Sequence, residues 1–259
     1  MRTNRIIILI IGFICSVQTI FAQGAAGDKA SIESQRIIDM PTAGMLAKGT
    51  YSVNTNCFTP GGIMVDFQAA LFKNFHLGVA FSGTGIVGRS SMKFQNMPGF
   101  SIKFRVLDED RTIPAIAIGF NSQGRGAWIK SLKRFETMSP GFFLAVSKNF
   151  SWALGNIAAH GGLNYSVEPN SDNKNVNFYA GCEQSLGSRL AINFEYNFNL
   201  DEKNYDILEN CGMLNSSIRY SIADGVTLEL ELRDLLGHIK ASSGKQIERR
   251  LNLEIVRAF

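Results

Sequence analysis

From residue 48 onward, apolar residues recur at every second position in one block of sequence after another. In residues 190–198, for example, large apolar side chains alternate with Asn193, Glu195 and Asn197. Period two is typical of a β-strand with one apolar face. About twelve such segments occur, at residues 48–57, 62–71, 75–84, 100–108, 113–121, 140–148, 156–166, 176–184, 190–199, 213–222, 225–233 and 249–259. Each is near the length that a tilted strand needs to cross a bilayer.

The polar face of these segments separates two classes of β protein. A soluble sandwich or barrel also alternates, but its polar face meets water and normally carries many Lys and Glu. Here the polar positions hold mostly Asn, Ser, Gly, Ala and Thr with sparse charges, as the lumen of a membrane barrel does. We therefore predict an all-β fold, a closed transmembrane antiparallel β-barrel of about 12 strands.

The first 22 residues have the features of a cleaved secretory signal. Arg2 and Arg5 precede an apolar run from Ile6 to about Val17, and Ala22 ends the segment. Cleavage removes Arg2 and Arg5 from the 26 Lys and Arg and leaves 24 against 22 Asp and Glu. So small an excess gives no reason to expect a nucleic-acid partner. The expected organisation is a signal peptide at 1–22, a periplasmic N-terminal segment at 23–47 and the barrel at 48–259.

The connections between segments indicate an orientation. Those at 72–74, 108–112, 185–189 and 223–224 are short, whereas 85–99, 122–139, 200–212 and 234–248 are long. Outer-membrane barrels have short periplasmic turns and long outer loops. With an even number of strands, both termini are then expected in the periplasm. The predicted location is the outer membrane of a Gram-negative cell, with membrane lipid and lipopolysaccharide as partners.

The last segment, "LNLEIVRAF", has a distinctive pattern. Leu251, Leu253 and Ile255 share one face, and the chain ends on the aromatic Phe259. This pattern resembles the recognition signal read by the barrel assembly machinery, which we expect as a partner. Arg257 interrupts the apolar face, where an arginine near the headgroups can extend toward water.

Three stretches resemble one family. "RIIDMPTAGMLAKGTYSVN" at residues 36–54, "FSIKFRVLDEDRTIPAIAIGF" at 100–120, and "FFLAVSKNF" followed by "HGGLNYS" up to 166 are similar to the YjbH (YbjH-type) outer-membrane proteins associated with exopolysaccharide production. The resemblance implies a short single-barrel relative near polysaccharide export or surface assembly, with a polysaccharide or export proteins as partners. The first stretch also has a structural interpretation, because Pro41, Gly44 and Gly49 permit the chain to turn into its first strand.

Charged residues on the lumen-facing parity are the candidate lining residues. They are Lys103, Arg105, Glu195, Arg219, Glu229, Glu231, Arg233, Arg250 and Glu254. The last three strand segments are the richest. Opposite charges on neighbouring strands either pair and close a small lumen or line an open pore, and a barrel of 12 strands has space for both.

The loop at 122–139 is basic and aromatic. Its candidate binding residues are Arg125, Trp128, Lys130, Lys133 and Arg134. Trp128, Leu132 and Phe135 fall at helical spacing, which indicates a short amphipathic helix lying at the rim or folding into the mouth. Such a surface suits an acidic glycan or lipopolysaccharide phosphates, or is simply solvated.

The sequence does not favour catalysis or a cofactor. Of its three histidines, His76 and His160 fall on the inward parity, and His160 has no serine one or two residues away on the same face. No metal-ligand spacing is present. We therefore expect no enzyme, no metal and no cofactor. A disulfide between Cys57 and Cys211 remains open.

Three functions are compatible with this sequence. The first is a barrel that assists export or surface assembly of a polysaccharide. The second is a general small-solute porin, and the third is a closed structural barrel or adaptor of an envelope complex.

Overall fold

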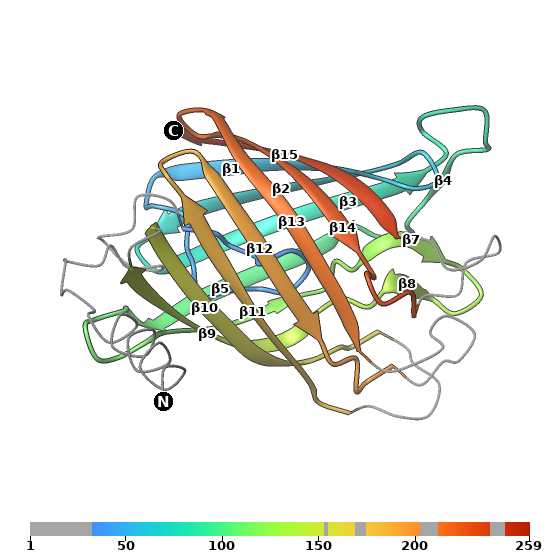
Figure 1. The fold of residues 1–259 in the computed structure, drawn as a ribbon. Coiled ribbons are helices and arrows are strands. Elements are labelled where there is room, and N and C mark those ends of the chain that lie inside the picture. Colours follow the sequence, from blue (N-terminus) through green and yellow to red (C-terminus); the bar gives the residue numbers. More distant parts are fainter. Residues whose placement is uncertain (1–32, 153–154, 169–174, 203–211, 239–246) are drawn as a thin grey trace, which may run out of the picture.

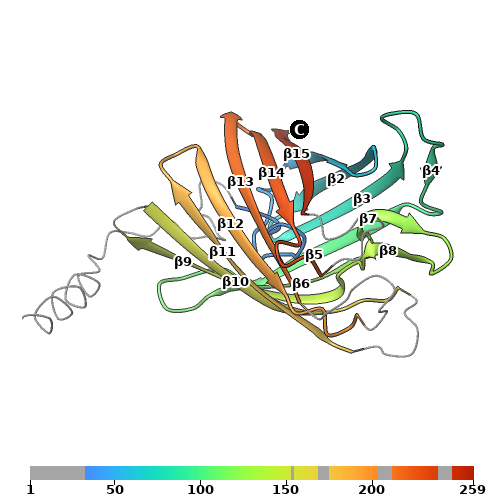
Figure 2. The same ribbon diagram turned by 45° about the vertical axis from the view of Figure 1, so that its right-hand side comes forward.

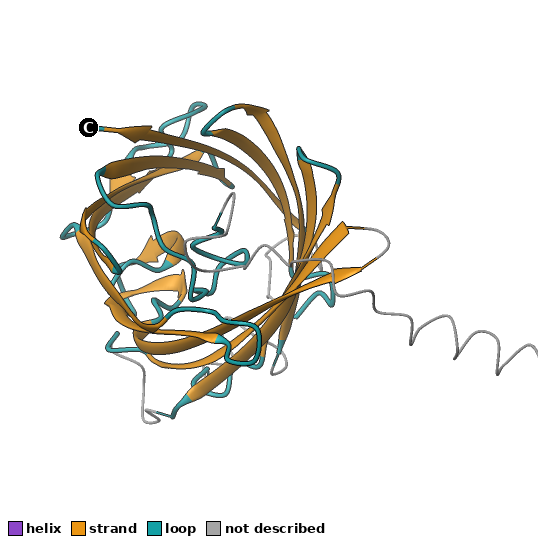
Figure 3. Cartoon of the chain, turned by 90° about the vertical axis from the view of Figure 1, so that its left-hand side faces the viewer, coloured by secondary structure: helices purple, strands orange, loops and turns teal. Residues whose placement is uncertain are grey.

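A computed structural model describes residues 33–152, 155–168, 175–202, 212–238 and 247–259. Twelve of its strands form one antiparallel ring (Figures 1 and 3). They are β1 (Thr50–Phe58), β2 (Gly62–Phe72), β3 (Phe75–Thr84), β5 (Gly99–Leu107), β6 (Ala115–Asn121), β9 (Gly141–Trp152), β10 (Gly155–Tyr165), β11 (Asn177–Leu186), β12 (Leu190–Asn197), β13 (Met213–Ala223), β14 (Val226–Arg233) and β15 (Glu248–Ala258). The ring closes where β1 pairs with β15, with Tyr51 opposite Arg257. The predicted closed barrel of about 12 strands is confirmed.

Three shorter strands lie outside the ring. The first, β4 (Lys93–Phe94), extends the edge of β3. The other two, β7 (Arg125–Ile129) and β8 (Arg134–Thr137), pair only with each other. Figure 2 shows this hairpin at the right-hand end of the barrel, and Figure 1 shows the C terminus at the opposite, left-hand end. The helix expected within residues 122–139 is therefore wrong.

The barrel is apolar outside and polar inside. Outward side chains such as Phe104 (46% exposed) and Leu230 (47%) are left uncovered, whereas the inward Asn193 and Glu195 are fully buried. A soluble monomer does not leave apolar side chains bare on strand after strand, but a bilayer would cover them. Among the described residues, no helix is both long and apolar enough to cross a membrane.

The two ends of the barrel differ in their connections. At one end, near the C terminus in Figure 1, the turns are short. One of them joins β13 to β14 through two residues, of which Gly225 has a φ of 64° and any Cβ on it would meet the carbonyl oxygen of Val256 at 2.5 Å. Arg257 lies beside this turn and donates to the carbonyl oxygen of Asp224 at 2.8 Å. We call the ends the short-turn end and the long-loop end.

The segment before the first strand does not lie where the sequence predicted. The sequence placed residues 23–47 in the periplasm, but the described part of that segment lies inside the barrel, because lumen side chains bind its backbone. The signal peptide lies outside the described residues. Cys211 also lies outside them, so the disulfide considered between Cys57 and Cys211 stays untested.

Candidate functional site

Residues 33–46 enter the lumen from the short-turn end and return to it before β1; we call them the inturned segment. Figure 1 shows the segment in blue within the barrel, and Figure 3 shows loops crossing the space inside the ring. Its tip is a tight hairpin in which Arg36 bridges to Pro41 and the N–H of Ile37 donates to the carbonyl oxygen of Met40 at 2.9 Å. Ile37, Ile38 and Met40 are buried there beside Tyr179 of the wall.

A wall carboxylate holds the backbone of this tip. Glu195 Oε2 accepts the consecutive N–H groups of Ile38, Asp39 and Met40 at 3.0, 2.9 and 2.9 Å. Its other oxygen, Oε1, accepts from Asn215 Nδ2 at 3.0 Å. Successive backbone N–H groups that converge on one point form an anion-binding nest, and a full negative charge strengthens each bond. Glu195 therefore fixes the hairpin to β12 through hydrogen bonds that add to its apolar contact with Tyr179.

The side chain of Asp39 points from the tip into a cluster of arginines. Arg233 donates to Asp39 Oδ2 from Nε at 2.9 Å and also from Nη2, and Arg125 Nε lies 3.7 Å from Oδ1. Burial alone would raise the pKa of Asp39, but the charges of Arg233, Arg250 and Arg125 outweigh it and hold that pKa below its usual value. Asp39 is thus an ionised carboxylate in a dry site, where its cations stabilise it.

The β7–β8 hairpin reaches the same point from the opposite end. Thr137 Oγ1 accepts from Arg233 Nη2 at 2.8 Å, so Arg233 joins Asp39 to the hairpin. Arg125 belongs to β7, and Gly126 next to it has a φ of 78° in space between Glu136 and Arg250, which leaves no place for a side chain. We call Asp39, Arg125, Thr137, Arg233 and Glu248 the Asp39 cluster. In it, two inward-folded segments from opposite ends of the barrel meet.

The cluster continues along the barrel wall through Glu248. Its carboxylate accepts from Arg233 Nη1 at 2.7 Å and from Arg250 Nε and Nη2 at 2.8 Å each. Glu248 and Arg250 are two positions apart on β15, so they share its inner face. Every ion pair here has side chains at most 14% exposed. Such a network is costly to break, because removing one partner leaves an uncompensated buried charge.

A second group of wall charges holds the base of the inturned segment. Arg219 donates to Glu183 at 2.9 Å, to Glu229 at 3.1 Å and to the carbonyl oxygen of Ile37 at 3.1 Å. Across the lumen, Lys103 Nζ donates to the carbonyl oxygen of Gln35 at 3.2 Å. Arg105 forms a 2.6 Å ion pair with Glu33. These charges bind the segment along its length rather than lining an open channel.

All nine candidate lining residues therefore face the inside of the barrel. Eight bind the inturned segment, each other or a neighbouring wall residue; among these, Glu231 accepts from Asn56 at 3.0 Å. Glu254 lies opposite Thr227 and Asn54 on the same inner face. The sequence reasoning missed two central partners, Asp39 and Glu248. The sequence signal for Glu248 is its position two residues before Arg250, on the same face of the strand. The signal for Asp39 is that it is the one charged residue within "IIDMPTAG".

The five candidate residues of the loop at 122–139 separate into two groups. Arg125 and Arg134 are buried, and Arg134 forms a 2.6 Å ion pair with Glu202 of the next long loop. Trp128, Lys130 and Lys133 lie at or near the hairpin tip, partly or fully exposed. The expected basic surface is therefore corrected: two of its arginines already have buried acidic partners and cannot bind an external anion.

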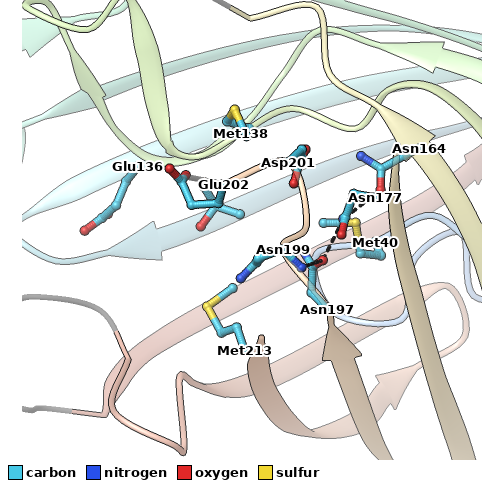
Figure 4. Close-up of a pocket in the computed structure, with 11 residues that line it drawn as sticks. Met40, Glu136, Met138, Asn164, Asn177, Asn197, Asn199, Asp201, Glu202 and Met213 are labelled. Carbon is cyan, nitrogen blue, oxygen red and sulfur yellow. Dashed lines mark hydrogen bonds between the residues drawn. The ribbon is translucent and has the colours of Figure 1, made fainter. Parts of the chain in front are cut away.

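A polar layer closes the lumen beside the hairpin. Asn177 Nδ2 donates to Asn164 Oδ1 at 3.0 Å and to Asn197 Oδ1 at 2.7 Å, which links β10, β11 and β12 (Figure 4). Met40, Met138 and Met213 lie on the same small cavity, whose volume of about 20 Å³ is enough for one water molecule. Among the described residues, the space beside the hairpin is therefore no larger than one water molecule, and we call this the filled half of the lumen.

The short-turn half of the lumen contains a larger space. A cavity of about 820 Å³ lies against the inner faces of β9 to β14 and is bounded at its inner end by Ser34, His160, Glu183 and Arg219. We call it the vestibule. It ends where the inturned segment is tied to the wall by Arg219, so the segment separates it from the filled half.

A serine and a histidine meet beside the vestibule. Ser147 on β9 lies opposite His160 on β10, with Ser147 Oγ 2.8 Å from His160 Nδ1. The sequence reasoning missed this pair because the two residues lie 13 positions apart. Ser147 is fully buried and accepts the N–H of Ala43 at 2.9 Å, so it anchors the inturned segment. Within the described residues, no group of His, Cys, Asp or Glu could hold a metal ion.

Comparisons with known proteins agree with the sequence motifs. A family model described as "YjbH: Exopolysaccharide biosynthesis protein YbjH" matches residues 35–233. No curated protein matches. Among solved structures, the chain is similar to the KdgM porin (TM-score 0.48, 10% identity, covering 81% of this chain and 99% of that one). It is also similar to the NanC porin (0.44, 7%, 81% and 99%) and to outer membrane phospholipase A from Escherichia coli (0.39, 13%, 82% and 97%).

Proposed function

The chain belongs to the YjbH family of exopolysaccharide biosynthesis proteins, and we propose that it assists the export or surface assembly of a polysaccharide at the outer membrane of a Gram-negative cell. In this proposal the barrel is the passage or docking point for the polymer, and the inturned segment is its closure. The chain performs no catalysis of its own.

The location is supported by the outer surface and by the sequence. A bare apolar exterior over a polar lumen suits a barrel surrounded by lipid, and the signal-like start suits an exported protein. In the outer membrane, the partners would be membrane lipid, lipopolysaccharide and, during insertion, the barrel assembly machinery. Both termini would lie on the periplasmic side with the short turns.

One observation carries the functional proposal: the segment at the start of the family match is the segment that occupies the lumen. Residues 35–46 begin the matched region and are held by Glu195, Arg219 and Arg233 through hydrogen bonds and ion pairs. When the segment moves, the polar groups that held it can form hydrogen bonds with water or with a hydroxyl-rich polymer instead. A closure built in this way suits a barrel that opens for a polar cargo.

Two other functions are weaker fits. A general small-solute porin needs a lumen that stands open, whereas two folded segments meet inside this one. A closed structural barrel or adaptor is favoured by the buried ion pairs of the Asp39 cluster, because such networks stabilise one arrangement. A purely structural role gives no reason for the vestibule, a cavity of about 820 Å³.

The proposal is tested by deleting the gene and measuring secreted polymer and envelope permeability in the same strain. We expect polymer in the medium to fall, with little change in uptake of a small hydrophilic dye. Complementation with the wild-type chain should restore the polymer. Unchanged polymer in the deletion strain would contradict the proposal, and loss of dye or solute uptake alone would favour the porin.

The last strand provides a separate test of outer-membrane assembly. Phe259 is exposed and stacks on Tyr51 with the ring centroids 5.8 Å apart, at the seam where the barrel closes. If Leu251, Leu253, Ile255 and Phe259 form the assembly signal, Phe259→Ala should lower the amount of folded barrel in the membrane severalfold. Ala258→Ser is the matched control and should have little effect. Equal folded yields for the two variants would count against the signal.

A further inference from the structure

The vestibule is a polar cavity that the closure of the lumen leaves unoccupied by the described chain. Its volume of about 820 Å³ falls within the range of roughly 300 to 1,000 Å³ that is usual for small-ligand sites. The inner faces of six consecutive strands, β9 to β14, form its wall. The structure therefore has a site-sized space next to the segment proposed as the closure.

The charges around the vestibule balance. Glu183 and Asp224 carry the negative charges of the lining, and Arg189 and Arg219 carry the positive ones. Two of the four are already paired, since Arg219 lies 2.9 Å from Glu183. A cavity whose lining has no net charge, and in which Arg219 is already paired with Glu183, gives no advantage to an anionic ligand.

Most of the remaining lining can exchange hydrogen bonds with hydroxyl groups. Asn149 and Asn156 supply amides, and Ser185, Ser221 and Thr227 supply hydroxyls. Amides and hydroxyls both donate and accept, which matches the dual character of a sugar hydroxyl. The described lining contains no phenyl or indole ring on which a sugar could stack.

His160 adds a buried group without a partner at the inner end. Its Nε2 is buried and has no hydrogen-bond partner among the described residues, while Nδ1 is bound to Ser147 Oγ. Because Ser147 already accepts the N–H of Ala43, the assignment that satisfies the most groups has Ser147 donating to Nδ1 and the proton on Nε2. His160 lines the vestibule, so a ligand that reaches its inner end would lie beside this imidazole.

We propose that the vestibule binds an uncharged, hydroxyl-rich oligosaccharide stretch of two to four sugar rings, with its inner end at His160. This proposal rests on the proposed function and names the substrate class of the same barrel. Binding is weak, on the order of millimolar, because no aromatic platform is present, and weak binding suits a polymer that must leave again.

The test is saturation-transfer NMR on the full chain in detergent micelles, with isomaltotriose as the uncharged probe and trigalacturonate as an acidic probe of equal length. Ala191 lines the vestibule, and Ala191→Trp would obstruct it. Ala180→Trp places the same side chain on the exposed outer face and is the matched control. We expect transfer to isomaltotriose in the wild type and the control, and a reduction of about tenfold or more in Ala191→Trp. Ser221→Phe is a second filling variant for the case that Ala191→Trp does not fold.

Each other result overturns the proposal. Absence of transfer to isomaltotriose in the wild type, or equal transfer in the filled and control variants, would contradict a site in the vestibule. Binding of trigalacturonate in preference to isomaltotriose would contradict the uncharged ligand. If isomaltotriose does not bind but the deletion strain loses its polymer, the site is refuted and the proposed function stands. If isomaltotriose binds in the vestibule but the deletion strain exports polymer normally, the proposed function is refuted and the site stands.

Discussion

The two halves of the lumen are built from similar walls but filled differently. At the long-loop half, the tip of the inturned segment and the β7–β8 hairpin meet around Asp39 and Arg233, and the cavity left has a volume of about 20 Å³. At the short-turn half, the wall carries comparable charges, Glu183 and Arg219, yet a cavity of about 820 Å³ remains. The charges of the wall therefore do not close this barrel; the inward-folded segments do.

The difference also has an energetic side. Charges in the filled half are buried with several partners each, so their ion pairs are hardly screened by solvent. Beside the vestibule, the side chain of Glu183 is 20% exposed, against 0% and 1% for Arg233 and Asp39 in the filled half. Equivalent substitutions should therefore cost far more in the filled half.

The largest effect is expected at Asp39. Asp39→Asn keeps the shape of the side chain but leaves Arg233 and Arg125 facing a neutral amide in a dry site. The free energy of unfolding should fall by about 3 kcal/mol, as for other broken buried pairs. Urea unfolding in detergent, followed by heat-modifiable gel mobility, measures it. Asp110→Asn, in an exposed loop at the short-turn end, is the control and should change stability by less than about 0.5 kcal/mol. Similar losses for both variants would refute the contrast.

The same substitution can be made in both halves at Glu195 and Glu183. Glu195→Gln removes the charge that holds three backbone N–H groups and should cost about 2 kcal/mol. Glu183→Gln affects one partly exposed ion pair and should cost less than about 1 kcal/mol. Unfolding of the two variants under one set of conditions gives the difference. A larger loss for Glu183→Gln would mean that the base of the inturned segment, not its tip, is the main attachment.

The hairpin from the long-loop end offers a pair of adjacent cations. Arg134 is buried against Glu202 and donates to the carbonyl oxygen of its neighbour Phe135 at 2.9 Å, whereas Lys133 is exposed. Arg134→Ala should lower stability by about 2 kcal/mol and raise protease cleavage within 122–139. Lys133→Ala should leave both nearly unchanged. Equal protease sensitivity would indicate that the hairpin is not held inside by this ion pair.

A pH dependence of opposite sign is expected at two aspartates. Burial raises the pKa of Asp201 to about 6 from 3.8, so ionisation of Asp201 destabilises its loop as pH rises from about 4 to 6. Asp39, with its lowered pKa, stabilises the fold at pH above about 4 and loses that contribution only in stronger acid. Asp201→Asn should therefore flatten the stability profile between pH 4 and 6. An unchanged profile in that window would contradict the assignment to Asp201.

The barrel itself could be predicted from sequence because alternation is a local property. Each of the twelve segments falls within four residues of its strand boundaries, as at 225–233 against β14 (Val226–Arg233). The inward position of the nine lining charges follows from the same parity. A strand has only two faces, so one correctly placed residue fixes all the others.

The loop at 122–139 shows where local pattern failed. Trp128 and Phe135 are seven positions apart, which fits one face of a helix. In the structure they are cross-strand partners in the β7–β8 hairpin, with ring centroids 4.9 Å apart at an angle of 75°. A helix and a hairpin would both bring these two rings together. The left-handed φ of Gly126 and the ion pair of Arg134 with Glu202 favour the hairpin.

The partners of the buried charges could not be predicted either. Arg233 and Asp39 are 194 positions apart, and their contact depends on a segment that folds into the lumen instead of staying outside. Strand parity says that Arg233 points inward but not what it meets there. Ser147 and His160 were missed for a related reason, because a pair across two strands is set by register and not by spacing along one.

Conductance of the barrel in planar bilayers, with and without its inturned segment, tests directly whether that segment closes the lumen. We expect the wild type to show no steady conductance above the leak of the membrane, because the Asp39 cluster closes the lumen. A variant lacking residues 36–44, which removes the tip with Asp39 and its contacts to Glu195, should form channels of stable size. Equal traces from the two proteins, whether both silent or both conducting, would contradict the claim that the inturned segment closes the barrel.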